Sequence, residues 1–207
     1  MQLILVVCLF MTCYFQAIAQ SEIKIADQVW MSKNLDVMYF RNGEKIPQAK
    51  SQKAWQNLTQ KGKPAWCYFN FDSKLGKKYG KLYNVFCVFD SRGLAPEGWR
   101  IPSQSDWNTL STNLGGYQFA GKKLKSIVSW INGEFSNNES GFDALPGGYC
   151  HPMGYFQDVL GKYGNWWSST LANRYETYSM QLHHNNTNFY IEKQDNRNGF
   201  SVRCIKE

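Results

Sequence analysis

The stretch Gly98-Trp99-Arg100-Ile101-Pro102 decides the fold, because the clearest helix of the chain follows it. Ser103 is a suitable N-terminal cap for that helix, and Asp106 completes a shortened capping box three residues later. Apolar side chains then recur at spacings of three and four and form one buried stripe, Trp107, Leu110 and Leu114. Gly115-Gly116 ends the helix. The sequence therefore predicts an amphipathic helix with one face in the core.

A second, shorter helix is predicted over residues 120–127, with Leu124 and Ile127 facing inward. On both sides of this helical region, apolar residues alternate with polar ones or form short runs typical of strands. Strands are expected over residues 28–31, 35–39, 66–69, 82–89, 175–182, 188–192 and 200–205. Because strands come first and last, the predicted class is α+β, with two short helices packed on short antiparallel strands and long loops.

Three segments between the early strands are interpreted as turns or loops. Asn42-Gly43 favours a hairpin turn, and residues 46–63 favour a packed loop with at most one helical turn. The segment from Lys74 to Gly80 is typical of a turn. Its basic cluster is interpreted as a solvated surface or, alternatively, as a patch for an anionic ligand, formed by Lys74, Lys77, Lys78 and Lys81.

The composition sets broad limits on function. The chain has 207 residues, of which 19% are charged and 16% aromatic, and these values exclude a disordered tail or a coiled coil. Its 23 basic and 16 acidic residues give a net charge of +7, a weak bias toward anionic partners. Nucleic acid is not expected as a partner, because the chain has the features of an exported protein and contains no basic helix.

Residues 1–19 are interpreted as a secretory signal peptide, although no basic residue precedes its apolar run. The run from Leu3 to Phe15 is shorter than the roughly 20 residues that span a bilayer, and Ala17-Ile18-Ala19 has signal-peptidase spacing. We therefore expect a single domain over 20–207, without a transmembrane segment, that is secreted, periplasmic or on the outer cell surface. A lipid anchor at Cys8 or Cys13 is the alternative.

The remaining chain carries four cysteines, Cys67, Cys87, Cys150 and Cys204. Export makes disulfides a candidate feature, and four cysteines allow three pairings. A small buried thiol is an equally good interpretation of Cys87, which lies in an apolar run. The spacing of these cysteines matches no CxxC or Cys/His metal motif.

Six segments of the chain resemble, in order, the Fibrobacter succinogenes major paralogous domain: Asp27–Leu35, Tyr79–Asn84, Pro96–Pro102, Gly141–Tyr149, Tyr163–Thr170 and Asn198–Cys204. The resemblance covers about residues 25 to 206. It implies an exported or surface protein of Bacteroidota-type bacteria and a C-type-lectin-like, sulfatase-modifying-factor-like fold, and it implies no established activity.

The chain departs from that family at its cysteines. Family members usually carry Cys where this chain has Ala95, whereas Cys87 and Cys150 occupy positions that are not usually cysteine. The resemblance therefore implies that a family disulfide is rewired, with Cys67 and Cys87 as the candidate partners of Cys204.

No catalytic residues are predicted. The sequence has no GxSxG, HExxH or phosphate-binding glycine loop, and only His151, His183 and His184 would act as unperturbed bases near neutral pH. Neighbouring residues of a strand face opposite sides, so His183 and His184 are a poor pair for one site. The sulfatase-modifying relatives use a pair of nearby cysteines that this chain lacks. A degenerate enzyme of that type remains an alternative.

Ligand recognition fits the composition better. Aromatic rings and amides gather around glycine-rich loops, and the candidate ligand-binding residues are Tyr149, Tyr155, Tyr163, Asn165, Trp166 and Trp167. Flat rings take the apolar face of a sugar while amides supply directed hydrogen bonds, so a non-catalytic glycan-binding or adhesion module is predicted. Carbohydrate or a cell-surface protein is the expected partner. Two alternatives stay open: the tryptophans belong to the core, or the protein is a structural surface component.

Calcium is the one cofactor that the sequence suggests, and no metal site is predicted. Carboxylates at Glu139, Asp143 and Asp158 are of the ligand type that Ca²⁺ prefers. Their spacing matches no defined calcium loop.

Overall fold

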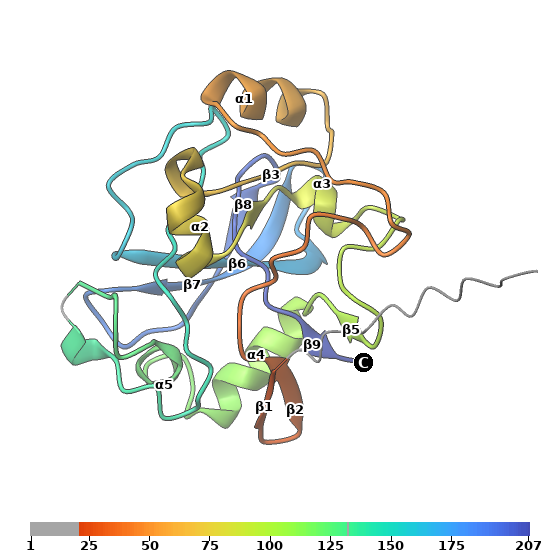
Figure 1. The fold of residues 1–207 in the computed structure, drawn as a ribbon. Coiled ribbons are helices and arrows are strands. Elements are labelled where there is room, and N and C mark those ends of the chain that lie inside the picture. Colours follow the sequence, from red (N-terminus) through yellow and green to blue (C-terminus); the bar gives the residue numbers. More distant parts are fainter. Residues whose placement is uncertain (1–20, 132) are drawn as a thin grey trace, which may run out of the picture.

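The computed structural model describes residues 21–131 and 133–207, so the predicted signal peptide and the lipid-anchor candidates lie outside the described residues. Within them, short helices and small antiparallel sheets are mixed along the chain, which confirms the α+β class (Figure 1). In the described part of the chain the strands form a four-stranded, a two-stranded and a three-stranded sheet.

The four-stranded sheet joins the two ends of the domain. Its strands β1 (Glu22–Ile25) and β2 (Gln28–Met31) form a hairpin. The order continues through β9 (Ile205–Lys206) to β5 (Trp99–Arg100), so the C-terminal strand lies between two earlier strands (Figure 1). The family-like segments at both ends of the chain are therefore side by side.

The three-stranded sheet contains the three longest strands of the described residues. It consists of β6 (Tyr163–Leu171), β7 (Glu176–His183) and β8 (Tyr190–Asp195), each antiparallel to the next. Side chains that alternate along each strand separate two faces. Trp166 and Met180 are paired across β6 and β7 and lie in the hydrophobic core. Asn165 and Gln181, the neighbouring pair, point to the opposite face.

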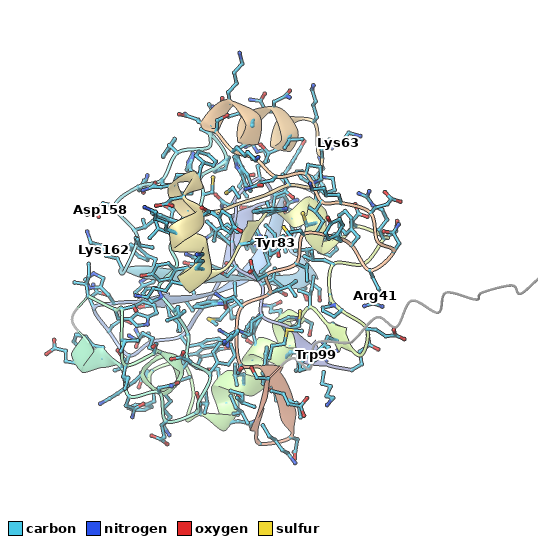
Figure 2. All side chains as sticks on the ribbon, viewed as in Figure 1. Arg41, Lys63, Tyr83, Trp99, Asp158 and Lys162 are labelled. Carbon is cyan, nitrogen blue, oxygen red and sulfur yellow. The ribbon has the colours of Figure 1, made fainter. Side chains whose placement is uncertain are left out.

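The helix predicted after Pro102 is confirmed as α4 (Gln104–Asn113), and both hydrogen bonds of the capping box are present between Ser103 and Asp106. Trp107 stacks on Trp30 of β2 with 4.8 Å between ring centroids. The second predicted helix is present as α5 (Ala120–Leu124), which is shorter than expected, and Ile127 is exposed rather than buried. Trp99 of β5 is buried beside β9 and belongs to a separate hydrophobic cluster (Figure 2).

Five local predictions are wrong. The predicted strand 200–205 contains isolated bridges at Phe200 and Ser201, and a regular strand begins only at Ile205. Residues 46–63 contain the helix α1 (Gln52–Gln60), and the predicted turn at 74–80 is the helix α2 (Ser73–Tyr79). The predicted strand 82–89 is the short strand β4 (Leu82–Tyr83), paired with β3 (Trp66–Cys67), followed by the helix α3 (Val85–Val88). Residues 35–39 contain only an isolated bridge, Tyr39 with Lys45, around the turn at Asn42-Gly43.

The three helices that the sequence did not predict, α1, α2 and α3, share one feature. A polar side chain caps the start of each. Ser51 accepts a hydrogen bond from the Ala54 amide, and Asp72 accepts one from the Lys74 amide. Asn84 accepts one from the Cys87 amide and so ends β4 where the apolar pattern continues. Such caps satisfy amides that have no partner inside the helix. Two 3₁₀ turns, η1 (Phe69–Phe71) and η2 (Gly133–Phe135), complete the described elements.

Hydrogen bonds of the Asn34 and Arg203 side chains connect the core elements. The Asn34 Oδ1 atom accepts hydrogen bonds from Trp166 Nε1 at 2.8 Å and from Arg203 Nη2 at 2.9 Å. Arg203 is buried and also donates to the carbonyl oxygens of Met31 and Phe142, at 3.2 and 2.6 Å. These bonds link β2, β6 and the C-terminal segment, and they position the three-stranded sheet that carries the candidate site.

Candidate functional site

A concave pocket of about 570 Å³ lies on the face of the three-stranded sheet that carries Asn165 and Gln181. Side chains of β6 and β7 form the floor of the pocket. The register of the two strands pairs Tyr163 with His183 and Asn165 with Gln181. Residues two apart on a strand share a face, so these four side chains form one patch. The segment from Tyr149 to Gln157 forms the opposite wall.

Carboxamide side chains dominate the polar lining of the pocket. They are Gln157, Asn165, Gln181, Gln194 and Asn198. Each carboxamide offers two N–H donors and one carbonyl acceptor. Some of these groups already bind one another: Tyr149 Oη and Gln157 Oε1 are 3.2 Å apart, and Asn198 Nδ2 donates to Gln194 Oε1 at 3.3 Å. The remaining donors and acceptors suit a ligand that carries several hydroxyl or amide groups.

Asn165 is one of two buried amides of the pocket, at 4% exposed, and the other is Asn198 at 6%. The Asn165 side-chain nitrogen is buried and has no hydrogen-bond partner among the described residues. Buried polar groups in folded proteins are nearly always hydrogen-bonded, and an unpaired donor costs about 1–3 kcal/mol. Asn165 lines the pocket, so this donor lies next to the pocket floor.

His183 stands between two tyrosine rings at one end of the pocket. Its ring stacks on Tyr190 with 4.5 Å between centroids and meets Tyr163 edge-on at 4.9 Å. Burial lowers the pKa of His183, and the nearby charge of Lys125 lowers it further. The ring is therefore neutral at pH 7 and presents one donor and one acceptor.

His151 stands at the other end and is neutral as well, because burial lowers its pKa. Its Nδ1 atom accepts the Met153 amide N–H at 3.2 Å, so the neutral ring carries its proton on Nε2. Tyr155 stacks on the His151 ring with 4.1 Å between centroids and fixes its orientation.

The charged residues of the pocket, Asp195 and Arg197, neutralise each other. Arg197 Nε donates to Asp195 Oδ1 at 2.9 Å, and Arg197 Nη2 donates to Oδ2 at 2.6 Å. Burial acts to raise the pKa of Asp195, but the bonds and charge of Arg197 hold the pKa below its usual value. The pocket is thus polar and close to neutral in charge, which suits an uncharged polar ligand.

The structure brings three of the six predicted binding residues into the pocket, namely Tyr149, Tyr163 and Asn165. Tyr155 does not line the pocket itself. Its ring stacks on the ring of His151, which does. For Trp166 and Trp167 the predicted ligand contact is corrected, because both are 0% exposed and present no face to a ligand. They are core residues, the alternative that the sequence left open.

Sequence reasoning missed five of the residues that define the pocket, His151, His183, Gln157, Gln181 and Gln194. The sequence identifies His183 only as one of three histidines and as a poor partner for His184 in one site. The available signal was the alternation of polar residues in β7, which places Gln181 and His183 on the same side of a strand whose other face is apolar. The pairing with Tyr163 and Asn165 depends on register, which the sequence does not specify.

The disulfide prediction is corrected as well, because Cys67, Cys87, Cys150 and Cys204 are all buried free thiols. Cys204 packs in one hydrophobic cluster with Cys87, whereas Cys67 and Cys150 belong to another. Burial raises the pKa of the Cys204 thiol to about 12, so this group is un-ionised and acts as a small apolar side chain.

The three candidate calcium ligands do not form a site. Among the described residues, no three His, Cys, Asp or Glu side chains come together as a metal-binding group. Glu139 pairs with Lys123 at 3.1 Å, and Asp158 pairs with Lys162 at 2.5 Å on the molecular surface (Figure 2).

The four lysines of the basic cluster at 74–81 do not share one surface. Lys81 is buried and bound to Asp36, while Lys74, Lys77 and Lys78 are exposed on α2.

Lys125 lies behind the pocket and makes the stability of the fold depend on pH. It is 0% exposed, and Nζ donates to the His183 and Asn186 carbonyl oxygens at 2.9 and 2.5 Å. Burial lowers its pKa to about 8. In the unfolded chain the pKa is about 10.4, so between these values the unfolded state binds more protons and stability rises with pH. Below pH 8 both states are protonated, and the burial penalty is complete.

We therefore expect the free energy of unfolding of the wild-type protein, relative to that of Lys125→Met, to increase by about 2 kcal/mol from pH 8 to 10.5. Urea unfolding at a series of pH values measures this difference. Parallel pH curves for the two proteins would contradict it.

An α+β domain with a neutral, amide-rich pocket is the class that these features define. The Fibrobacter succinogenes major domain model matches residues 23–206, and the chain belongs to that family. No curated protein and no solved structure matches the chain. Among the helices of residues 21–131 and 133–207, none is long and apolar enough to cross a membrane.

Proposed function

We propose that this protein is an exported, non-catalytic recognition or adhesion module that binds an uncharged glycan in the pocket on the three-stranded sheet. The proposal includes a C-type-lectin-like architecture, a place outside the cytoplasm and carbohydrate as the partner, either free or on a cell surface.

The chemistry of the pocket supports a sugar ligand. Tyr149 and Tyr163 supply aromatic rings, and the carboxamides around them supply donors and acceptors for hydroxyl groups. The neutral state of His151 and His183 favours an uncharged ligand over an anion, as does the mutual pairing of Asp195 with Arg197. Concave sites with a few convergent polar groups are typical of small-ligand binding.

The unpaired Asn165 donor is the single observation that carries the proposal. Among the described residues with a buried unpaired side-chain atom, Asn165 is the one that lines the pocket, and an apolar residue of similar volume would avoid the cost. A ligand hydroxyl or carbonyl oxygen bound to Asn165 Nδ2 would remove the cost on binding. Function would then account for a group that the free fold does not need.

The test compares the purified wild-type protein with Asn165→Leu on a glycan array. We expect the variant to lose at least about tenfold in affinity, since a missing hydrogen bond leaves a ligand group unpaired. Its free energy of unfolding should be equal to that of the wild type or greater by about 1 kcal/mol. This combination separates a ligand contact from a structural role.

An array on which the wild-type protein binds nothing would overturn the glycan proposal. Equal binding by the two proteins would show that Asn165 is not a ligand contact. An empty array would also favour the alternative of a surface assembly protein. Phe119, Ile127 and Val128 are exposed apolar residues that would serve such an interface.

A further inference from the structure

A second hollow of about 470 Å³ lies directly beside the pocket, and the two share Asp195 and Arg197 as a common wall. Its other sides come from the end of α1, from α3 and from the β6–β7 hairpin, through Gln60, Phe86 and Tyr175. The wall between the two hollows is partly open to solvent, since the Arg197 and Asp195 side chains are 46% and 37% exposed. A bound chain can therefore pass over it.

Tyr175 provides a flat aromatic face in this second hollow. Its side chain is 62% exposed, although the backbone beneath it is held firmly. The Tyr175 amide donates to Asn173 Oδ1 at 2.8 Å, and the Tyr175 carbonyl accepts the Asn196 amide at 2.9 Å. A large exposed ring on a hairpin with fixed geometry adds nothing to the core, but it is suited to stack on a ligand.

Arg174 packs against the Tyr175 ring. Its guanidinium lies 4.3 Å from the centroid of the Tyr175 ring, and Asn196 Nδ2 donates to the Arg174 carbonyl oxygen at 3.2 Å. The guanidinium covers one side of the ring and restricts its rotation. The half-buried Phe86 ring lies in the same hollow. An apolar face beside polar groups matches the amphipathic surface of a sugar ring.

We propose that the second hollow is a second sugar subsite, so that the ligand is an oligosaccharide that crosses the Asp195–Arg197 wall. This inference rests on the proposed glycan-binding function and adds the length of the ligand to it. The first unit hydrogen-bonds to the amides of the pocket. A later unit stacks on Tyr175.

The test measures affinity against chain length. The probes are glucose, N-acetylglucosamine and mannose oligomers of one to six units, and the proteins are wild type, Tyr175→Ala, Tyr175→Phe and Leu171→Ala. Leu171 is the matched control because it is 53% exposed on the same hairpin and lines neither hollow. For the wild type we expect affinity to rise about five- to tenfold when the oligomer is long enough to reach Tyr175.

Tyr175→Ala should abolish that gain and leave the affinity for the shortest bound oligomer within about twofold, whereas Tyr175→Phe and Leu171→Ala should keep the gain. Wild-type binding that does not depend on length would overturn the second subsite and leave the pocket intact. An equal loss at every length would overturn it too, because Tyr175 would then act on the pocket itself. Absence of binding to all oligomers would overturn both proposals.

Discussion

Trp167→Ala is expected to lower the free energy of unfolding by about 3–5 kcal/mol, the usual cost of deleting a large buried aromatic side chain. The Trp167 ring is fully buried, lies 4.4 Å from the Phe200 ring between centroids, and donates from Nε1 to the Tyr83 carbonyl oxygen at 2.7 Å. Tyr83 lies at the centre of the molecule (Figure 2). The substitution thus leaves a cavity and removes one of the two hydrogen bonds that the Tyr83 carbonyl oxygen accepts, the other coming from the Phe200 amide at 3.0 Å.

Urea unfolding followed by circular dichroism measures this loss. Leu171→Ala at the exposed end of the same strand is the control, and its effect should be within about 0.5 kcal/mol. A loss below about 1 kcal/mol for Trp167→Ala would contradict the core assignment. The result also bears on binding studies, because a ligand affinity lost in this variant would report on the fold and not on a ligand contact.

Arg203→Ala is expected to cost a similar amount, about 3–5 kcal/mol, because it removes a large buried side chain together with its hydrogen bonds. The guanidinium donates to Asn34 Oδ1 and to the Met31 and Phe142 carbonyl oxygens, and it lies 4.3 Å from the centroid of the Phe142 ring. Truncation removes the Arg203 donor from both carbonyl oxygens and leaves Asn34 Oδ1 with the Trp166 Nε1 bond alone, and each unpaired buried group costs about 1–3 kcal/mol.

Arg203→Lys is the informative companion variant for this site. Lysine keeps the charge but lacks the planar fork that reaches Asn34 and both carbonyl oxygens together, so we expect it to lose more than half of the stability lost by Arg203→Ala. Denaturant midpoints of the three proteins measure the difference. A lysine variant as stable as the wild type would show that the charge alone, and not the geometry of the fork, stabilises the core.

Local chemistry explains which parts of the fold the sequence predicted. The helix α4 was predicted correctly because its cap, apolar stripe and terminal glycines all act within a few residues of one another. The helices α2 and α3 were missed because Asp72 and Asn84 override an apparent turn and an apparent strand with one capping bond each. Strands of two residues such as β5 and β9 have too few residues for a period to appear, and only tertiary pairing defines them.

The candidate site was partly predictable for a related reason. Tyr149, Tyr163 and Asn165 were found through their residue types near glycine-rich segments, and all three line the pocket. The two tryptophans have the same local signal, and only the packed structure shows that they are buried. His183 and Gln181 join the site through the register of β7 against β6, a long-range property that composition does not carry.

Nuclear magnetic resonance of the Asn165 side chain tests the glycan-binding claim most directly. The ¹⁵N-labelled protein is titrated with the oligomer that binds best on the array, and the side-chain amide signals are assigned with the Asn165→Leu variant. We predict that the Asn165 NH₂ signals shift in a saturable way, with the same dissociation constant as the ligand, because Nδ2 acquires its missing acceptor. Saturable binding that leaves the Asn165 signals unchanged would contradict the proposed site.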